Sequence, residues 1–254
     1  MSTRFKIKIA QGYDKYSNYI AEIPERFGRG EGTVIYDGRN SIHRLECDGH
    51  AFVVKRFRKV NFVQRVAYTF FRPTKAKRAF LFAKIFRDTG IATPHEVAYI
   101  EEYPGGFFTT GYFVSEECQD PPAFPALVPN PDYDKLLASD LAGLIARMHM
   151  KGILHGDLNF GNFLYRKEGN HYHFTVIDTN RSHFCHGVPT KEQCLYNLRT
   201  MTQRRDLYEF MAGEYAKCRG WDEAEIRKEA LEYLDRFLKK QERKWKLKNL
   251  IRKL

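Results

Sequence analysis

The sequence has 254 residues, of which 43% are hydrophobic and 15% aromatic, a composition that excludes a disordered chain and suits one large domain or two small lobes. No apolar run approaches the roughly 18 residues of a membrane span, the N-terminus lacks the apolar core of a secretory signal, and the cysteines include no C-x-x-C pair, so we expect a soluble cytoplasmic protein. The formal net charge of +11 indicates an anionic partner, which composition leaves open among a nucleotide, a nucleic acid, an acidic glycan and a membrane surface.

The first half of the chain is expected to be rich in strands. Short apolar runs, separated by the turn pairs at 37–38 and 48–49, predict the first three strands, and two more follow further along. The five predicted strands lie at 33–36, 41–46, 50–57, 96–101 and 110–117. One helix is predicted between the third and fourth strands, from Thr74 as its N-cap to about Asp88, with Gly90 at the C-cap.

A proline-rich segment separates this half from the rest. Five prolines fall within residues 121–131 (PPAFPALVPNP), a density that argues against helix or sheet interior and indicates a joint. Beyond it, apolar residues recur at helical spacing from Asp134 to Met150. The predicted fold class is therefore α+β, with a small β-rich N-lobe at 1–120, the joint at 121–131 and a mainly helical C-lobe at 132–254.

The chemistry-bearing residues follow the predicted helix that ends near Met150. The loop sequence HGDLNFGNFL places Asp157 and Asn162 on one segment, and Asp178 comes at the end of the apolar strand 174–177. Phosphoryl transfer needs a carboxylate that orients and deprotonates the attacking hydroxyl, oxygen ligands for Mg²⁺ and a cation on the ATP phosphates. Asp157 and Asn162 could place a base and a metal ligand side by side, and Asp178 would complete a set of oxygen donors suited to Mg²⁺.

The same loop resembles the H-x-D-x-x-x-x-N catalytic loop of the protein-kinase-like fold. Val53-Val54-Lys55 is similar to the strand-3 lysine motif of that fold, and Ile177-Asp178-Thr179-Asn180 stands where the metal-binding D-F-G would be. With Gly156 in place of arginine, and with the stretches VIYDGRNSIHRL, FVVKRF, AYTFFRPTKAKRAF and GIATPHEVAYIE, residues 33–200 look closest to the bacterial lipopolysaccharide kinase family (Kdo kinase, WaaP and InaA-like proteins).

This resemblance implies a two-lobed kinase that uses ATP and Mg²⁺ to phosphorylate a sugar hydroxyl of a lipid-linked glycan in the lipopolysaccharide core. The site residues that it implies are Asp157 as base, Asn162 and Asp178 as metal ligands, Lys55 as the cation on the α- and β-phosphates, and Glu116, Glu117 and Cys118 as backbone contacts to adenine. His155 is predicted to brace the loop, because Asp157 already fills the role of base.

Two glycine segments compete for the role of phosphate-covering loop. Gly28–Gly32 looks glycine-rich, but it lies too far ahead of Lys55 for two short strands and their turns, whereas the distance from Gly38 to Lys55 fits strand, turn and strand. We therefore place the phosphate cover at Gly38, Arg39, Asn40 and Ser41, with an ordinary hairpin turn as the alternative.

Two departures from the kinase pattern bear on function. No acidic residue occurs between Asp48 and Asp88, so the predicted helix cannot supply the glutamate that usually holds the strand-3 lysine, and Lys55 must be held by another acceptor or by phosphate. No A-P-E-like segment follows Asp178, which makes a peptide less suitable as acceptor than a small or lipid-linked hydroxyl. A pseudokinase that binds nucleotide without turnover and a protein Ser/Thr kinase remain the alternatives.

A basic helix is expected at the C-terminus, starting near Trp221. Its apolar residues fall on opposite faces before and after residue 245, which predicts that 222–245 packs on the helical lobe while 246–254 projects. Lys246, Lys248, Arg252 and Lys253 could attach the projecting part to an anionic membrane surface on the cytoplasmic side, the alternative being a solvated end or a protein-docking face. Zinc near His183 and Cys185 is a weaker possibility, and nucleic acid is not expected as a partner.

Overall fold

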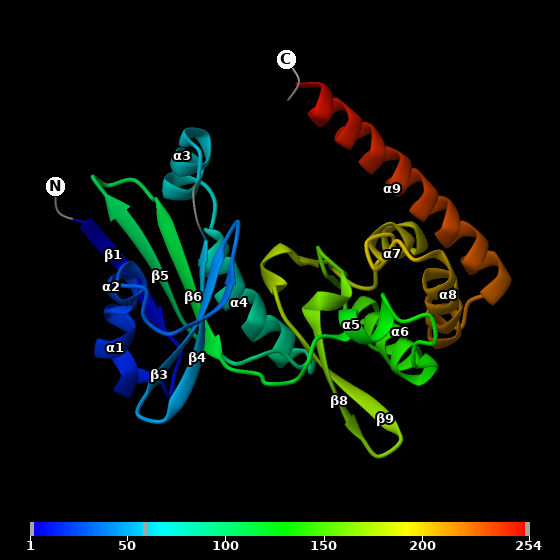
Figure 1. The fold of residues 1–254 in the computed structure, drawn as a ribbon, viewed down its shortest axis with the longest axis horizontal. Helices are drawn as coiled ribbons and strands as arrows, with labels where there is room; N and C mark the ends of the chain where they lie inside the picture. The colour runs from blue at the N-terminus through cyan, green and yellow to red at the C-terminus, as the bar shows by residue number, and fades with distance from the viewer. Residues whose placement is uncertain (1–2, 58–59, 252–254) are drawn as a thin grey trace. The chain divides into compact units, whose positions relative to one another are not determined.

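The chain forms two compact units in the computed structural model, which describes residues 3–57 and 60–251 (Figure 1). The N-terminal unit is the chain up to Gln119 together with the short segment Asp178–Asn180, and the C-terminal unit is Asp120–Ile177 and the chain from Arg181 onward. The first unit is built around a sheet and the second mainly from helices, which confirms the predicted α+β class.

One antiparallel sheet is the framework of the N-terminal unit, with strand order β1-β5-β6-β4-β3-β2. Its strands are β1 (Thr3–Ile9), β2 (Thr33–Asp37), β3 (Ser41–Cys47), β4 (His50–Phe57), β5 (Glu96–Pro104) and β6 (Thr110–Glu116). All five predicted strands are present. The sixth, β1, lies at the edge of the sheet with almost every residue exposed. It is missing from the prediction although Phe5, Ile7 and Ile9 alternate with basic residues, which is the pattern of a strand.

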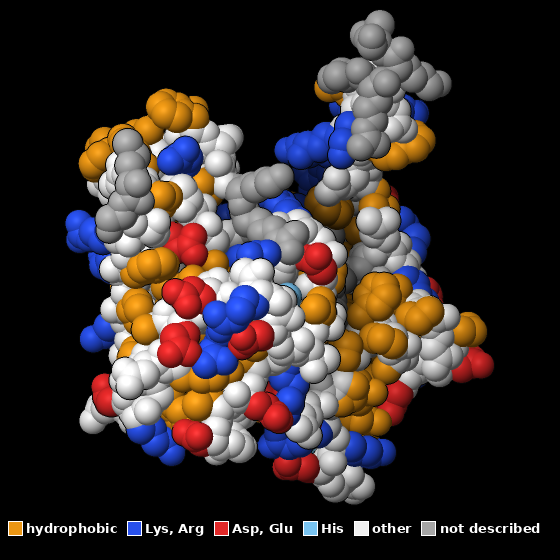
Figure 2. Space-filling view, turned by 60° about the vertical axis from the view of Figure 1, so that its left-hand side comes forward, with side chains coloured by type: hydrophobic (Ala, Val, Ile, Leu, Met, Phe, Trp, Pro, Cys, Tyr) orange, Lys and Arg blue, Asp and Glu red, His pale blue; other side chains and the backbone are white. Residues whose placement is uncertain are grey.

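The helices of this unit differ in how much of their surface they bury. They are α1 (Ser17–Ala21), α2 (Ile23–Gly28), α3 (Phe62–Phe70) and α4 (Lys75–Asp88). The predicted cap of α4 is confirmed, because the Thr74 hydroxyl oxygen accepts a hydrogen bond from the backbone N–H of Lys77 at 3.1 Å. Helix α3, in contrast, buries no residue. Figure 2 shows hydrophobic side chains exposed at the upper end of this unit, the height at which α3 lies in Figure 1.

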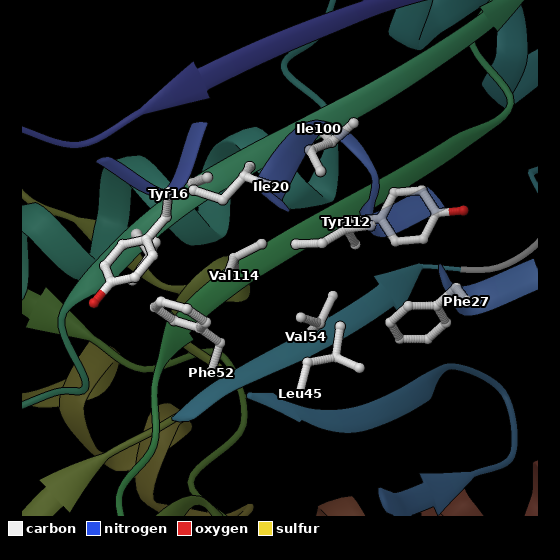
Figure 3. Packing of buried hydrophobic residues seen from close by; sticks show 12 residues of the cluster. Tyr16, Ile20, Phe27, Leu45, Phe52, Val54, Ile100, Tyr112 and Val114 are labelled. Atoms are coloured by element: carbon white, nitrogen blue, oxygen red, sulfur yellow. The ribbon is translucent and has the colours of Figure 1, made fainter. Parts of the chain in front are cut away.

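Alternation along β4 fixes the direction of Lys55. Phe52 and Val54 face α1 and α2 in a core that also contains Tyr16 and Ile20 (Figure 3). Successive strand residues point to opposite sides of a sheet, so Lys55 stands on the other face. On that face Phe57 packs in a second cluster with α4, whose members include Ala76, Ala79 and Phe80. The lysine is thereby held on a central strand between β3 and β6.

The C-terminal unit combines five α-helices with two short antiparallel pairs of strands among its described residues. The helices are α5 (Ala123–Leu127), α6 (Lys135–Met150), α7 (Lys191–Leu198), α8 (Arg205–Arg219) and α9 (Glu223–Ile251). The paired strands are β7 (Ile153–Leu154) with β10 (His183–Phe184), and β8 (Phe163–Glu168) with β9 (His171–Val176). Helix α6 is the predicted helix, capped by Asp134. No helix in the described ranges has the length and apolarity needed to cross a bilayer.

The proline-rich segment is more ordered than the sequence predicts. Helix α5 forms within it, with Pro122 at the N-cap and Pro125 in the first turn, where a missing N–H costs no helical hydrogen bond. The segment that follows is held by Arg204, whose guanidinium donates hydrogen bonds to the carbonyl oxygens of Leu127, Val128, Asn130 and Pro131. The prolines of α5 thus stand at a helix start and not in a helix interior, as predicted, whereas the short helix itself is not predicted.

A buried histidine ties α6 to α7 and α8. His149 is fully buried; the Tyr215 hydroxyl lies 2.8 Å from its Nδ1, and the Asn197 side-chain oxygen lies 3.0 Å from its Nε2. Nε2 therefore donates to Asn197, and Nδ1 accepts from Tyr215. Burial lowers the pKa of His149 to about 4.

This histidine should make the protein sensitive to mild acid. In the unfolded chain the imidazole takes up a proton near pH 6.5, whereas in the folded chain it does so only near pH 4, so stability is complete above about pH 6.5 and falls as the pH is lowered. Between pH 6.5 and 5 the free energy of unfolding should drop by about 2 kcal/mol. Urea unfolding at these two pH values measures it: the drop should shrink in His149→Gln and persist in His171→Gln, which changes an exposed histidine. An equal drop in His149→Gln and the parent would contradict this assignment.

Helix α9 stops packing against its unit at an earlier residue than predicted. It is one continuous helix, and its buried residues Ile226, Ala230 and Leu234 all lie in its first half. From Lys239 almost every residue is exposed, and Trp245, which the sequence places against the lobe, is 64% exposed. The reason is length: α9 has 29 residues whereas α8, on which it packs, has 15. The last three residues of the predicted projecting segment, 252–254, lie outside the described residues.

Candidate active site

The N-terminal unit brings Lys55 and Asp178 together. The Lys55 Nζ lies 2.7 Å from Asp178 Oδ1, and the two side chains are 16% and 28% exposed. This is the acceptor that the sequence leaves unidentified: Asp178 takes the place of a helix glutamate as the partner of the strand-3 lysine. A partly desolvated ion pair of this length fixes the direction of both charges.

Asp178 adopts an unusual backbone conformation. Its φ is 56°, a left-handed value that only Asp48 shares among the non-glycine residues described. Its carboxylate also accepts a hydrogen bond from the Asn180 side-chain amide, and Asn180 is itself buried. Non-glycine residues with positive φ cluster at functional sites, because the surrounding structure must hold them there. The chain thus aims this carboxylate by backbone geometry as well as by its partners.

In the C-terminal unit, His155 holds the start of the loop that carries Asp157. The buried imidazole donates from Nε2 to the Ile177 carbonyl oxygen at 3.1 Å, and its Nδ1 accepts from the Asp157 backbone N–H at 3.2 Å. Asn197 on α7 donates to the His155 carbonyl oxygen at 2.7 Å. Both imidazole nitrogens bond to backbone groups, so the prediction that His155 braces the loop is confirmed.

The same loop positions Asn162 next to Asp157. The side-chain Nδ2 of Asn162 donates to the backbone carbonyl oxygen of Asp157 at 2.9 Å. The backbone carbonyl oxygen of Asn162 accepts from the Ile177 N–H, also at 2.9 Å. Asn159 caps the turn between them by accepting from the Gly161 N–H. Because the amide nitrogen of Asn162 is engaged, its Oδ1 is the atom that could coordinate a cation.

Arg181 is a site residue that the sequence analysis misses. Its Nη1 lies 3.7 Å from Asp157 Oδ2, and the two side chains are 49% and 33% exposed. A guanidinium beside the carboxylate adds positive charge where phosphate chemistry is expected. The only sequence signal is its place three residues after Asp178, which no motif marks.

Gly156 has a steric reason for replacing the arginine of the protein-kinase loop. A Cβ at this position would overlap the backbone carbonyl oxygen of Arg181. We expect Gly156→Ala to lower the free energy of unfolding by about 1–3 kcal/mol, because backbone rather than a flexible side chain must give way. Chemical denaturation measures it, with Gly28→Ala as control, since nothing lies within 4 Å of a Cβ there. Equal stability of the two variants would show that the loop can yield at Gly156.

The predicted phosphate cover lies in the turn between β2 and β3. Ser41 is buried and its hydroxyl donates to Asp37 Oδ1 at 2.7 Å, while the Gly38 N–H donates to the Asn40 carbonyl oxygen at 3.0 Å. The Ser41 hydroxyl and the Gly38 N–H, which were predicted to meet phosphate, thus form hydrogen bonds within the turn. Of the predicted groups, the Arg39 and Asn40 side chains remain as candidates for contact with phosphate. Gly28–Gly32 belongs to the end of α2 and the turn after it, where a Cβ on Gly32 would overlap the Arg44 backbone.

The predicted adenine-contacting residues lie at the end of β6, whose last residue is Glu116, and directly after it. The Glu116 N–H is bonded to the His95 carbonyl oxygen, and the Glu117 N–H to that of Ala51. The Glu116 side chain accepts from the Tyr13 hydroxyl at 2.6 Å, and that of Glu117 accepts from Arg44 at 2.7 Å. Both carboxylates are therefore engaged within the fold. Over the described ranges, no group of three or more His, Cys, Asp or Glu side chains is placed to hold a metal, the predicted zinc alternative included.

Comparison with known proteins identifies the class to which this fold and these motifs belong. Residues 28–216 match the model of the lipopolysaccharide kinase (Kdo/WaaP) family, and the chain belongs to that family. It is a phosphotransferase acting on a sugar hydroxyl, with a protein-kinase-like fold. No match was found among curated protein sequences.

Two solved structures are similar to this chain. WaaP in complex with acyl carrier protein matches with a TM-score of 0.59 and 18% identity, over 94% of this chain and 98% of that chain. The Rio2 kinase–ADP/Mg²⁺–phosphoaspartate complex from Chaetomium thermophilum matches with a TM-score of 0.48 and 15% identity, over 86% and 76%. The first of these likenesses supports the two-unit architecture.

Proposed function

We propose that this protein transfers the γ-phosphoryl group of ATP to a sugar hydroxyl of a lipid-linked glycan in the lipopolysaccharide core. The observation that carries the proposal is the Lys55–Asp178 pair. A lysine fixed on a central strand supplies the cation for ATP phosphates, and a carboxylate aimed by a left-handed backbone supplies an oxygen donor for the accompanying metal. Membership of the lipopolysaccharide kinase family supports the choice of acceptor.

The residues fit Mg²⁺ by the chemistry of their donor atoms. Asp178 offers a carboxylate and Asn162 an amide oxygen, the hard ligands that Mg²⁺ accepts together with phosphate oxygens and water. When bound, the ion would neutralise charge that develops on the transferred phosphoryl group. Asp157 would accept the proton of the attacking sugar hydroxyl and orient it, with Arg181 beside it to attract the anionic phosphate.

Nucleotide binding would rest on Lys55, on the turn between β2 and β3 and on the backbone at the end of β6. Lys55 would contact the α- and β-phosphates once ATP competes with Asp178 for its ammonium group. Arg39 and Asn40 would cover the phosphates, with Gly38 and Ser41 shaping the turn that presents them. The Glu116 carbonyl and the backbone of Cys118 would contact adenine.

The test is a transfer assay with γ-labelled ATP, the purified protein and three acceptor pools: extracted bacterial glycolipids, free sugars and proteins. The proposal expects Mg²⁺-dependent label in the glycolipid pool. Label in proteins alone would favour a protein kinase. ATP binding without transfer or hydrolysis would favour the pseudokinase, the alternative suggested by the absence of an acid between Asp48 and Asp88 and weakened by the presence of Asp178 at Lys55.

We further propose that the protein works at the cytoplasmic face of the membrane, where a lipid-linked acceptor and ATP meet. The exposed half of α9 supports this, because it combines the apolar side chains of Trp245, Leu247 and Leu250 with many bases. Each base near an anionic leaflet contributes about 1 kcal/mol, which gives weak and salt-sensitive attachment. Leu247→Ser/Leu250→Ser should reduce co-sedimentation with anionic vesicles at low salt. Equal co-sedimentation would leave α9 as a solvated helix or a protein-docking face.

A further inference from the structure

Helix α3 presents its apolar side to solvent. At about 3.6 residues per turn, Phe62, Val63, Val66 and Phe70 share one face of this helix, and Arg65, Tyr68 and Thr69 share the other. Phe62, Val63 and Phe70 are 75%, 74% and 63% exposed. This is the reverse of an ordinary surface helix, which turns its apolar stripe toward the core.

The polar face of α3 is the side that fixes it to the protein. The Thr69 hydroxyl oxygen accepts from the Phe108 N–H at 3.0 Å, and the Tyr68 ring packs edge-on against Phe108 with centroids 5.6 Å apart. At the other end, Asn61 and Gln64 form a reciprocal capping box. The capping box thus fixes the start of the helix, and the contacts of Tyr68 and Thr69 hold its polar face against the β5–β6 turn. The apolar face is therefore directed outward.

The exposed apolar surface extends beyond the helix itself. Phe71, directly after α3, is 79% exposed, and Phe107 in the β5–β6 turn is 40% exposed with its ring 6.1 Å from that of Phe70. We call Phe62, Val63, Phe70, Phe71 and Phe107 the aromatic patch. A contiguous apolar patch of this kind on a folded protein marks an interaction site.

The charge around the aromatic patch is positive. The exposed Arg72 directly follows Phe71, Arg65 lies on the other face of α3, and no acidic residue occurs in the chain between Asp48 and Asp88. The nearby acids on β5 are turned inward: Glu101 is buried and accepts from Thr74 and Tyr103, and Glu102 accepts from Tyr112. A partner for this surface must therefore be apolar at its centre and anionic at its rim.

We propose that the aromatic patch inserts into the headgroup–acyl boundary of a bilayer that contains anionic lipids. A helix with phenylalanine and valine on one face and an arginine on the other, followed by the exposed Arg72, has the composition of an interfacial membrane helix. A bilayer also suits a helix that buries nothing of its own. Stable peripheral binding needs two weak signals, and α3 supplies one that does not depend on α9. The inference goes beyond the proposed reaction and does not require it.

The test is binding of the full chain to vesicles of phosphatidylcholine alone and with phosphatidylglycerol. Phe70→Ser/Phe71→Ser should weaken binding to the anionic vesicles by about tenfold or more, because two inserted rings are lost. The matched control is Phe124→Ser/Val188→Ser, which removes two side chains that are 46% and 59% exposed in the C-terminal unit and should bind as the parent does. Equal binding of all three proteins would overturn the proposal.

A second readout detects insertion directly. In a Trp245→Phe background, Phe71→Trp should be quenched by lipids brominated on their acyl chains, and the background alone should not. Absence of quenching would overturn the membrane assignment, as would patch-dependent binding to a protein with no binding to vesicles. Phosphate transfer to detergent-dispersed glycolipid should be unchanged in Phe70→Ser/Phe71→Ser. A parent protein that binds vesicles through α3 but transfers no phosphate would refute the proposed function and leave this inference standing.

Discussion

Replacing Asp157 with asparagine is expected to lower phosphoryl transfer by about 10²-fold or more, the usual contribution of a positioned general base. The substitution keeps the shape of the side chain and removes its charge and proton affinity. The loop should survive it, because the hydrogen bonds that Asp157 makes to His155 and Asn162 come from its backbone N–H and carbonyl. Initial rates of label transfer from ATP measure the effect.

The control for this variant is Asp132→Asn, the same chemical change at an exposed aspartate of the C-terminal unit. It should transfer phosphate at the parent rate, and both variants should bind ATP as the parent does. Unchanged turnover in Asp157→Asn would remove this residue from the chemistry.

Replacing Asp178 with asparagine should weaken binding of Mg·ATP by at least about tenfold, since even residues that only support metal ligands contribute that much. Asparagine tolerates the left-handed backbone of this position and keeps an acceptor for Asn180, so the loss should come from the charge. Lys55 would lose its ionic partner in the same variant. Titration calorimetry with and without Mg²⁺ separates the two effects.

ATP alone should bind Asp178→Asn at least as well as the parent, because Lys55 is no longer engaged by a carboxylate. Equal affinity for Mg·ATP in variant and parent would show that Asp178 is a structural partner of Lys55 and not a metal ligand.

The sequence predicts the parts of the fold that depend on local pattern. The strand around Lys55 follows from its apolar alternation and flanking turns, and the cap at Thr74 follows from the residue type before an apolar helix. The order of Lys55, the Asp157 loop and Asp178 indicates the protein-kinase-like fold. Gly156 and the four quoted stretches indicate the family, which the match over residues 28–216 confirms.

The parts that the sequence does not predict depend on contacts between distant residues. The partner of Lys55 is Asp178, more than a hundred residues further along the chain. Arg181 and Asp157 are also distant in sequence and come together only in the folded structure. Helix α9 carries a continuous helical pattern, but the residue at which it leaves its unit depends on the length of α8, which the pattern of α9 does not contain.

The turn at Gly38 and Ser41 shows a limit of another kind. Its spacing from Lys55 agrees with a phosphate-covering loop, yet the Ser41 hydroxyl already donates to Asp37 inside the turn. Residue type alone does not distinguish a hydroxyl that is free to bind a ligand from one that already forms a hydrogen bond within its own hairpin.

The most direct measurement of the central claim is mass spectrometry and ³¹P NMR of lipopolysaccharide core glycolipid after incubation with the protein, ATP and Mg²⁺. We predict one new phosphate monoester on a core sugar, formed by the parent protein and nearly absent with Asp157→Asn. A glycolipid left unmodified by a parent protein that binds Mg·ATP, or a phosphate monoester formed equally well by Asp157→Asn, would contradict the account.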